Sequence, residues 1–180
     1  MNVKEILYNS IENHEAYLVS NIAQGKSYEV IDAICKECMP LLEQLEGDKS
    51  EIIVSFAEGL IHYLLTTSLI QSQRKITVGN IHVDISIPDV KTLKLSPQDA
   101  LVIAFSKTND VLTIKNRIID LEKIQPFREN IWIVLENDAD VRARTYSIRN
   151  NGKLSFSQIL NDIISFLTNK KQSKLKLFKI

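Results

Sequence analysis

Residues 76–107 read ITVGNIHVDISIPDVKTLKLSPQDALVIAFSK, and this stretch decides the fold class of the chain. From Ile81 to Ile87, apolar and polar residues alternate strictly, which is typical of a strand with one buried face. Gly79 and Asn80 give a turn signal in front of it, so we expect a hairpin with the short apolar run that precedes them. Residues 100–105 are apolar on both faces, as in a central strand. The stretch therefore predicts a small sheet with a few polar groups at one surface.

A helix and another strand are expected to follow this sheet. Asp110 can cap a helix that runs to about Ile124, and residues 131–135 form an almost wholly apolar strand. Strand, helix and strand at this spacing predict a crossover that joins two parallel strands. A further strand is expected at residues 145–149. A last helix should follow, capped by Ser155 or Ser157.

Residues 1–75 are expected to form a helical layer. The stretch from Val3 to Ile22 has an amphipathic pattern, and a second helical segment follows that Ser27 can cap. Pro40 must kink this second segment or start a new helix at its first turn. The chain in front of the sheet is therefore predicted to be all helical.

The helix expected from Ile52 to about Ile70 is the most apolar in the chain, and Asp48 and Glu51 before it have capping-box spacing. Its length approaches that of a membrane span, but Glu58 and His62 interrupt it and are costly in lipid. We therefore expect a central buried helix. Glu58 and His62 lie on one face, either as a local polar pair or as site residues that point at the sheet.

The composition is that of a globular protein with one domain. The chain has 180 residues, of which 44% are hydrophobic and 24% charged. We expect a single α/β domain over residues 1–168, with a helical part (1–75) and a sheet part (76–168), then a basic tail at 169–180. The sequence shows no signal-peptide pattern and no disulfide framework, so a cytoplasmic location is expected.

Cys35 and Cys38 form a CxxC pair, which raises the possibility of a redox or zinc site. Zinc needs two further ligands, and no second pair of ligands with suitable spacing exists. The pair lies inside an expected helix, where positions i and i+3 share one face. We therefore expect two cysteines of the core and no metal site.

Charge is unevenly distributed along the chain. Residues 1–75 carry six Lys/Arg and eleven Asp/Glu, a net charge of −5, whereas residues 138–180 carry nine and three, a net charge of +6. A basic C-terminal part can meet an anionic partner such as DNA, or it can form a solvated face. The candidate nucleic-acid contacts are four lysines of the tail: Lys170, Lys171, Lys174 and Lys176.

Most enzyme motifs are absent, including the Walker loop, GxGxxG, HExxH and the nucleophile elbow. The order of elements, helix, three strands, helix and strand, nevertheless resembles the restriction-endonuclease-like, PD-(D/E)xK nuclease superfamily over roughly residues 50–136. Members of this superfamily place an Asp on the second strand and (D/E)xK on the third. The resemblance implies that Asp89, which follows a proline as in "PD", or Asp84 is that acid, and that Lys107 is the lysine.

The chain departs from this pattern at one position. Phe105 occupies the place of the second metal-binding carboxylate, and Mg²⁺ needs oxygen ligands. The resemblance therefore implies a degenerate site that binds and does not cut, without a cofactor. If the protein is an active nuclease, it would use Mg²⁺ with Asp84 or Asp89, Lys107 and the preceding helical Glu58. Alternatively, Asp84 lies on a solvated strand face and Lys107 at a strand end.

The C-terminal residues 172–179 resemble the PIP box, the peptide with which proteins bind the sliding clamp PCNA. Its pattern is Q-x-x-aliphatic-x-x-aromatic-aromatic; Gln172, Leu175 and Phe178 match, and Lys179 replaces the second aromatic residue. The resemblance implies that Leu175 and Phe178 enter an apolar pocket of the clamp and that Gln172 enters a polar one. The alternatives are a plain basic tail or a last short strand at the sheet edge.

These observations together favour one α/β domain with an N-terminal helical layer and a mixed sheet of four or five strands flanked by helices, restriction-endonuclease-like. The favoured function is a non-catalytic DNA-associated or protein-interaction module on a degenerate nuclease-like scaffold. The alternatives are an active metal-dependent nuclease and a structural subunit that forms a homodimer through its helices. Expected partners are DNA, a sliding clamp or a second copy, and no membrane.

Overall fold

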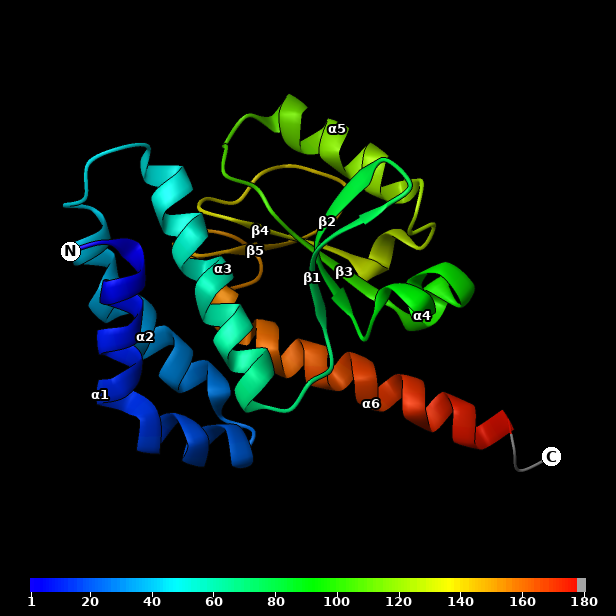
Figure 1. Cartoon of the computed structure of the whole chain (residues 1–180), viewed down its shortest axis with the longest axis horizontal. Helices are drawn as coiled ribbons and strands as arrows, with labels where there is room; N and C mark the ends of the chain where they lie inside the picture. The colour runs from blue at the N-terminus through cyan, green and yellow to red at the C-terminus, as the bar shows by residue number, and fades with distance from the viewer. Residues whose placement is uncertain (178–180) are drawn as a thin grey trace.

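The structure of the protein is a computed structural model; it describes the backbone of residues 1–177 and the side chains of residues 1–174. Three N-terminal helices form one layer, and a five-stranded sheet with further helices forms the rest (Figure 1). No helix in this part of the chain combines the length and apolarity that a bilayer crossing requires.

Helices α1 (Val3–Ala23) and α2 (Ser27–Leu42) pack against each other at the outer side of the molecule. Asn2 and Glu5 form a capping box at the start of α1. Pro40 lies inside the last turn of α2, which ends two residues later, so the expected restart of a helix at Pro40 is wrong. Ser27 is not the cap of α2 either; its hydroxyl donates to the side chain of Asn161 at 2.7 Å.

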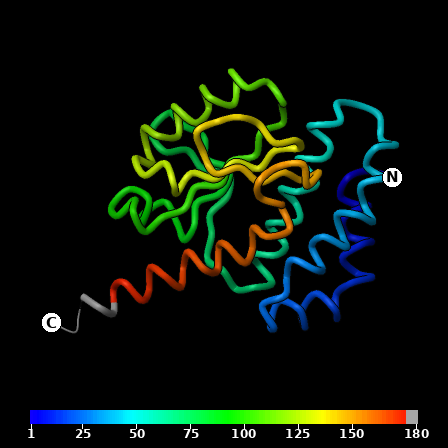
Figure 2. The backbone as a smooth tube through the Cα atoms, turned by 180° about the vertical axis from the view of Figure 1, so that it is seen from behind, coloured from blue at the N-terminus to red at the C-terminus, as the bar shows by residue number. Residues whose placement is uncertain are grey.

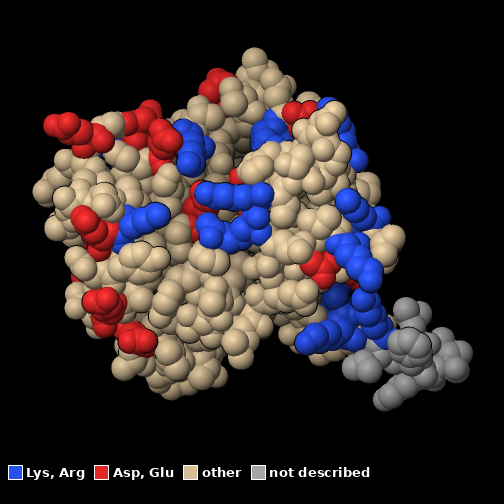
Figure 3. Space-filling model, in the orientation of Figure 1, with Lys and Arg blue, Asp and Glu red and all other residues tan. Residues whose placement is uncertain are grey.

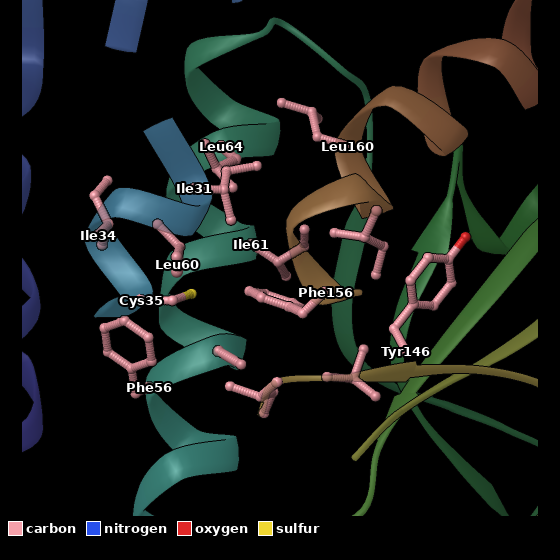
Figure 4. Packing of buried hydrophobic residues seen from close by; sticks show 14 of the residues in the cluster. Ile31, Ile34, Cys35, Phe56, Leu60, Ile61, Leu64, Tyr146, Phe156 and Leu160 are labelled. Carbon is pink, nitrogen blue, oxygen red and sulfur yellow. The ribbon is translucent and has the colours of Figure 1, made fainter. Parts of the chain in front are cut away.

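Helix α3 (Lys49–Thr67) is the central helix of the molecule, as predicted. The Asp48 side chain accepts the backbone N–H of Glu51 at 2.8 Å, so the helix begins three residues before the expected start at Ile52. Figure 4 shows Leu60 and Leu64 of α3 between side chains of α2 and residues of the sheet and C-terminal helix. Both leucines are fully buried, and they belong to the larger of the two hydrophobic cores.

The five strands lie in the order in which they occur along the chain. They are β1 (Gln73–Val78), β2 (Ile81–Ile87), β3 (Leu101–Phe105), β4 (Ile131–Leu135) and β5 (Arg144–Ser147). The pairs β1–β2 and β2–β3 are antiparallel, whereas β3–β4 and β4–β5 are parallel. Helix α5 (Val111–Glu122) makes the crossover from β3 to β4. The predicted hairpin, central strand and parallel crossover are therefore confirmed.

Each face of the sheet contributes to a separate core. Leu101 and Ile103 of β3 face α1, α2 and α3, whereas Val102 and Ala104 face α5. All four side chains are buried, which explains why this strand is apolar on both faces. The helical layer and α5 therefore cover opposite faces of one sheet.

Two helices differ from the expectation. The short α4 (Val90–Leu95) between β2 and β3 was not predicted. The last helix, α6 (Ile159–Leu177), extends away from the helical layer (Figure 2). It includes residues 169–177 of the expected tail, so a strand at the sheet edge is wrong for these residues. Their lysines, glutamine and leucines are good helix formers.

Candidate functional site

The ladder of the β1–β2 hairpin is interrupted at the point where Asp84 lies. Ladder pairs join Arg74 to Ile85 and Ile76 to Val83, but the pair between them, Lys75 with Asp84, is missing. Lys75 has a φ of 49°, a left-handed conformation that is rare for a residue with a side chain. The register is the same on both sides of the missing pair, so the ladder is interrupted at this one position without an inserted residue.

The residues of β2 on the two sides of Asp84 enter different cores. Val83 belongs to the core under α5, whereas Ile85 and Ile87 belong to the core under the helical layer. The strict alternation in this strand predicted a single buried face for all of these residues, and that prediction is wrong. The change of core falls at Asp84, which lies between Val83 and Ile85, where the ladder with β1 is interrupted.

Asp84 accepts a hydrogen bond at the end of β3 and lies close to His82. Its Oδ2 accepts the backbone N–H of Phe105 at 2.9 Å, and its Oδ1 lies 3.2 Å from Nε2 of His82. The side chain of Asp84 is only 19% exposed. The structure therefore brings Asp84 and Phe105 together, and the carboxylate replaces an acceptor that a regular strand pair would supply.

Glu58 of α3 faces the same hairpin and is held by two cations. Its Oε1 lies 3.6 Å from Nη2 of Arg74 and 3.7 Å from Nζ of Lys75, and its side chain is 13% exposed. Neighbouring residues of a regular strand point to opposite faces, so the left-handed Lys75 explains how both cations reach one carboxylate. No hydrogen bond or ion pair joins Glu58 to His62 among the described residues, so of the two alternatives the local polar pair is wrong. Partial burial and the nearby Arg74 lower the pKa of His62.

Lys107 and Asp89 lie at opposite ends of β3. Lys107 follows the carboxyl end of the strand, and its Nζ is 3.9 Å from Oε1 of Glu51. Asp89 caps α4 near the amino end, where it accepts the backbone N–H of Thr92 at 2.6 Å; hydrogen bonds from Thr92 lower its pKa. The five residues of β3 span about 17 Å. The structure therefore places Asp84, and not Asp89, near Lys107.

A buried acid that the sequence analysis did not select lies at the same end of the sheet. Glu136, directly after β4, accepts hydrogen bonds from the Ser50 hydroxyl and from Nε of Arg149, the latter at 2.7 Å. The Asn109 amide lies 3.4 Å away, and Arg149 also donates to Glu43 at 2.7 Å. Glu136 thereby links the start of α3, the loop after β3 and the loop after β5. The only sequence signal was an acid directly after a wholly apolar strand.

The charge of Glu136 is stabilised in spite of its position. Its side chain is 8% exposed, and burial by itself raises the pKa of a carboxyl group. The hydrogen bonds from Ser50, Arg149 and Asn109 outweigh this effect, so the pKa of Glu136 lies below its ordinary value. Glu136 is therefore an ionised part of the scaffold.

The acids at this end of the sheet do not form a ligand set for a divalent ion. Mg²⁺ takes about six oxygen ligands, of which usually one or two are carboxylates of the protein and several are waters. Residues 1–174 contain no group of three or more His, Cys, Asp or Glu side chains that could hold a metal ion. Asp84 accepts the Phe105 amide, Glu58 is paired with two cations, and Phe105 offers no oxygen. Asp84 and Glu58 are therefore both engaged by groups of the protein itself.

The candidate contacts near the C-terminus lie on α6. Lys170, Lys171 and Lys174 line a cavity of about 660 Å³, and Nζ of Lys174 is 3.1 Å from Oδ2 of Asp99. Figure 3 shows Lys and Arg side chains gathered where α6 leaves the body of the molecule. Gln172 is exposed on the helix.

The other residues predicted for this region cannot be placed. The side chains of Leu175 and Lys176, and all of Phe178, lie outside the described residues. The predicted clamp contacts of Leu175 and Phe178, and the nucleic-acid contact of Lys176, therefore stay predictions.

Comparison with known proteins gives likeness in fold and none in sequence. No protein-family model matches the chain, and no curated protein sequence matches it. Among solved structures, a restriction endonuclease PspGI–substrate DNA complex matches with a TM-score of 0.63 and 16% identity over 94% of both chains. Metal-depleted Ecl18kI in complex with uncleaved, modified DNA matches with a TM-score of 0.55 and 13% identity, over 94% of this chain and 80% of that one. The chain therefore has the restriction-endonuclease-like fold that its order of elements predicts.

Proposed function

We propose that the protein is a DNA-associated module that keeps the fold of a nuclease and does not cleave DNA. The observation that carries this proposal is at Phe105. This residue stands two positions before Lys107, where the (D/E)xK pattern has a carboxylate, and its backbone N–H binds the carboxylate of Asp84. One acid of the pattern is absent, and the other accepts a hydrogen bond from the scaffold.

The charges around this centre support a structural role for its acids. Metal-dependent hydrolysis of a phosphodiester needs carboxylates that hold the ion beside the scissile phosphate. Here Arg74 and Lys75 supply positive charge to Glu58, and Glu51 lies close to Lys107. The cations of the protein itself thus balance the acids that would otherwise attract a metal ion.

Association with DNA is supported by two independent features. Both solved structures with this fold that are compared above are complexes with DNA, by their descriptions. This chain also carries exposed lysines on α6, and lysines bind the phosphates of nucleic acids without regard to sequence. A function in protein–protein contact alone would not explain why the fold is similar to those of two proteins in complex with DNA.

The test is a paired assay of cleavage and binding with the full chain. Labelled single-stranded, duplex and branched DNA are incubated with the protein in Mg²⁺ or Mn²⁺, and affinity is measured by fluorescence anisotropy at low salt. We expect binding without cleavage. Cleavage that disappears in Asp84→Asn but persists in Asp140→Asn, an exposed acid elsewhere, would contradict the proposal. Absence of any DNA binding at low salt would also contradict it.

One observation favours the alternative of an active nuclease. Asp84 and Lys107 both lie at the carboxyl end of β3, the arrangement that the PD-(D/E)xK pattern implies. Glu51, 3.9 Å from Lys107, would be a further acid. Isothermal titration with Mn²⁺ separates the two functions, because an active centre would bind the ion and Asp84→Asn would abolish that binding. We expect no saturable binding of Mn²⁺.

A further inference from the structure

The groove beside α6 is lined by both aliphatic residues and lysines. We define the α6 groove as the cavity between α6, α4 and the loop from α3 to β1. Its lining includes the aliphatic residues Ile70, Ile164 and Leu167 and the lysines Lys170, Lys171 and Lys174. The helix that carries these lysines projects from the body of the molecule (Figure 2).

The lysines of the α6 groove are mostly without acid partners. Among the described residues, no carboxylate lies within 4 Å of Lys170 or Lys171, and Lys174 alone is paired, with Asp99. Lys91 and Lys94, on the neighbouring helix α4, are exposed and also have no such partner within the described part of the chain. By contrast, the cations at the other end of the sheet are bound to Glu58 and Glu136. Lys170 and Lys171 are thus two cations of the groove without an acid partner among the described residues, in the region where Figure 3 shows Lys and Arg side chains gathered.

The α6 groove is distant from the nuclease-like centre. Pro88 and Asp99, which precede β3, line the groove, whereas Asp84 is bonded to the carboxyl end of that strand. The strand between them spans about 17 Å. A ligand that contacts the lysines of the groove therefore lies away from Asp84 and Lys107.

The lining of the groove indicates which form of DNA it fits. Proteins that hold single strands stack the bases on aromatic side chains. No aromatic residue of the described chain lines this groove, so the bases of a single strand would find no stacking surface. The lysines along α6 instead match the phosphates along the backbone of a duplex, which need only positive charge.

We infer that duplex DNA binds at the α6 groove, with one sugar–phosphate backbone along Lys170, Lys171 and Lys174 of α6. The inference rests on the proposed association with DNA and adds the place and the form of the nucleic acid. DNA held there lies away from Asp84 and Lys107, so changes at these two residues leave affinity unaltered.

The test compares two triple variants of the full chain. The groove variant carries Lys170→Ala, Lys171→Ala and Lys174→Ala, and alanine preserves the helix. The control variant carries Lys115→Ala, Lys123→Ala and Lys153→Ala, three exposed lysines elsewhere on the molecule. Binding of a labelled duplex is measured by anisotropy at several salt concentrations. Circular dichroism and thermal unfolding verify that both variants are folded.

We expect the groove variant to bind the duplex at least about tenfold more weakly than the unmodified protein does. The slope of log K against log salt concentration should decrease in magnitude by about 2 to 3. The control variant and Lys107→Ala should stay within about threefold of the unmodified protein. The duplex should bind more tightly than a single strand of equal length.

The outcomes separate this inference from the proposed function. If the duplex binds and the groove variant binds it as well as the control does, the inference is wrong and the association with DNA stands. If the unmodified protein binds no DNA, the proposed function itself is wrong. Tighter binding of a single strand, or of poly-glutamate as a stand-in for an acidic protein segment, would also overturn the inference.

Discussion

Asp84 illustrates how one side chain replaces part of a hydrogen-bond ladder. Its carboxylate accepts the N–H of Phe105 where regular pairing between β2 and β3 has ended. In Asp84→Ala this partly buried N–H loses its acceptor, and we expect a loss of about 1–3 kcal/mol in the free energy of unfolding. Asp84→Asn keeps an acceptor and should lose less. Urea denaturation measures both; equal stability of Asp84→Ala and the unmodified protein would show that the bond contributes nothing.

Glu136 makes a prediction about acid stability. The pKa of Glu136 in the folded protein is lower than the ordinary value of 4.5, so its ionised form stabilises the fold above that pH. This stabilisation is lost as the pH falls through the lower, folded pKa. We expect Glu136→Gln to be less stable than the unmodified protein at pH 7 and the difference to shrink below about pH 4. Chemical denaturation across this range measures it, and a difference independent of pH would refute the assignment.

At the scale of elements, α3 is the helix on which both layers depend. Leu60 and Leu64 are fully buried within it, among the side chains of Figure 4. Truncation of either to alanine leaves a cavity and should reduce the free energy of unfolding by about 2–5 kcal/mol. Leu112 on α5 is 67% exposed and serves as the control. Leu112→Ala should change the free energy of unfolding by less than about 0.5 kcal/mol. A loss below about 1 kcal/mol at both buried positions would show that α3 is peripheral.

Helix α6 makes a prediction about the clamp-like peptide. The helix continues to Leu177, so a clamp peptide that begins at Gln172 starts within it. Lys179 also stands in place of one aromatic anchor. We therefore expect that the full chain does not bind a sliding clamp through Leu175 and Phe178. Leu175→Ala and Phe178→Ala should then leave any signal with the clamp unchanged. Surface plasmon resonance with immobilised clamp measures this; binding lost in these variants and retained in Lys171→Ala would establish the clamp hypothesis.

At the scale of the whole molecule, charge and fold divide the protein into two ends. The end with Asp84, Glu58 and Glu136 balances its charges internally, whereas the α6 groove does not. The formal net charge of zero conceals this division, because the excess of acids in residues 1–75 offsets the basic C-terminal part. The α6 groove can therefore bind an anion although the net charge of the whole protein is zero.

The sequence by itself determined the elements whose signals are local. Alternation, turn residues and caps placed the hairpin, β3, the α5 crossover and α3, because periodicity and capping depend on residues only a few positions apart. The resemblance in element order then led to the fold. That resemblance also selected Asp84 and Lys107 as candidate site residues.

Only the tertiary structure decided what those residues contact. Val83 and Ile85 of β2 belong to different cores beside the left-handed Lys75 of β1, and no local pattern in β2 records this change. Asp89 matches the "PD" motif in sequence but caps α4 at the other end of β3, and Glu136 gains partners from three distant segments. Such contacts depend on strand register and on the packing of segments far apart in the chain, and these are properties of the folded molecule.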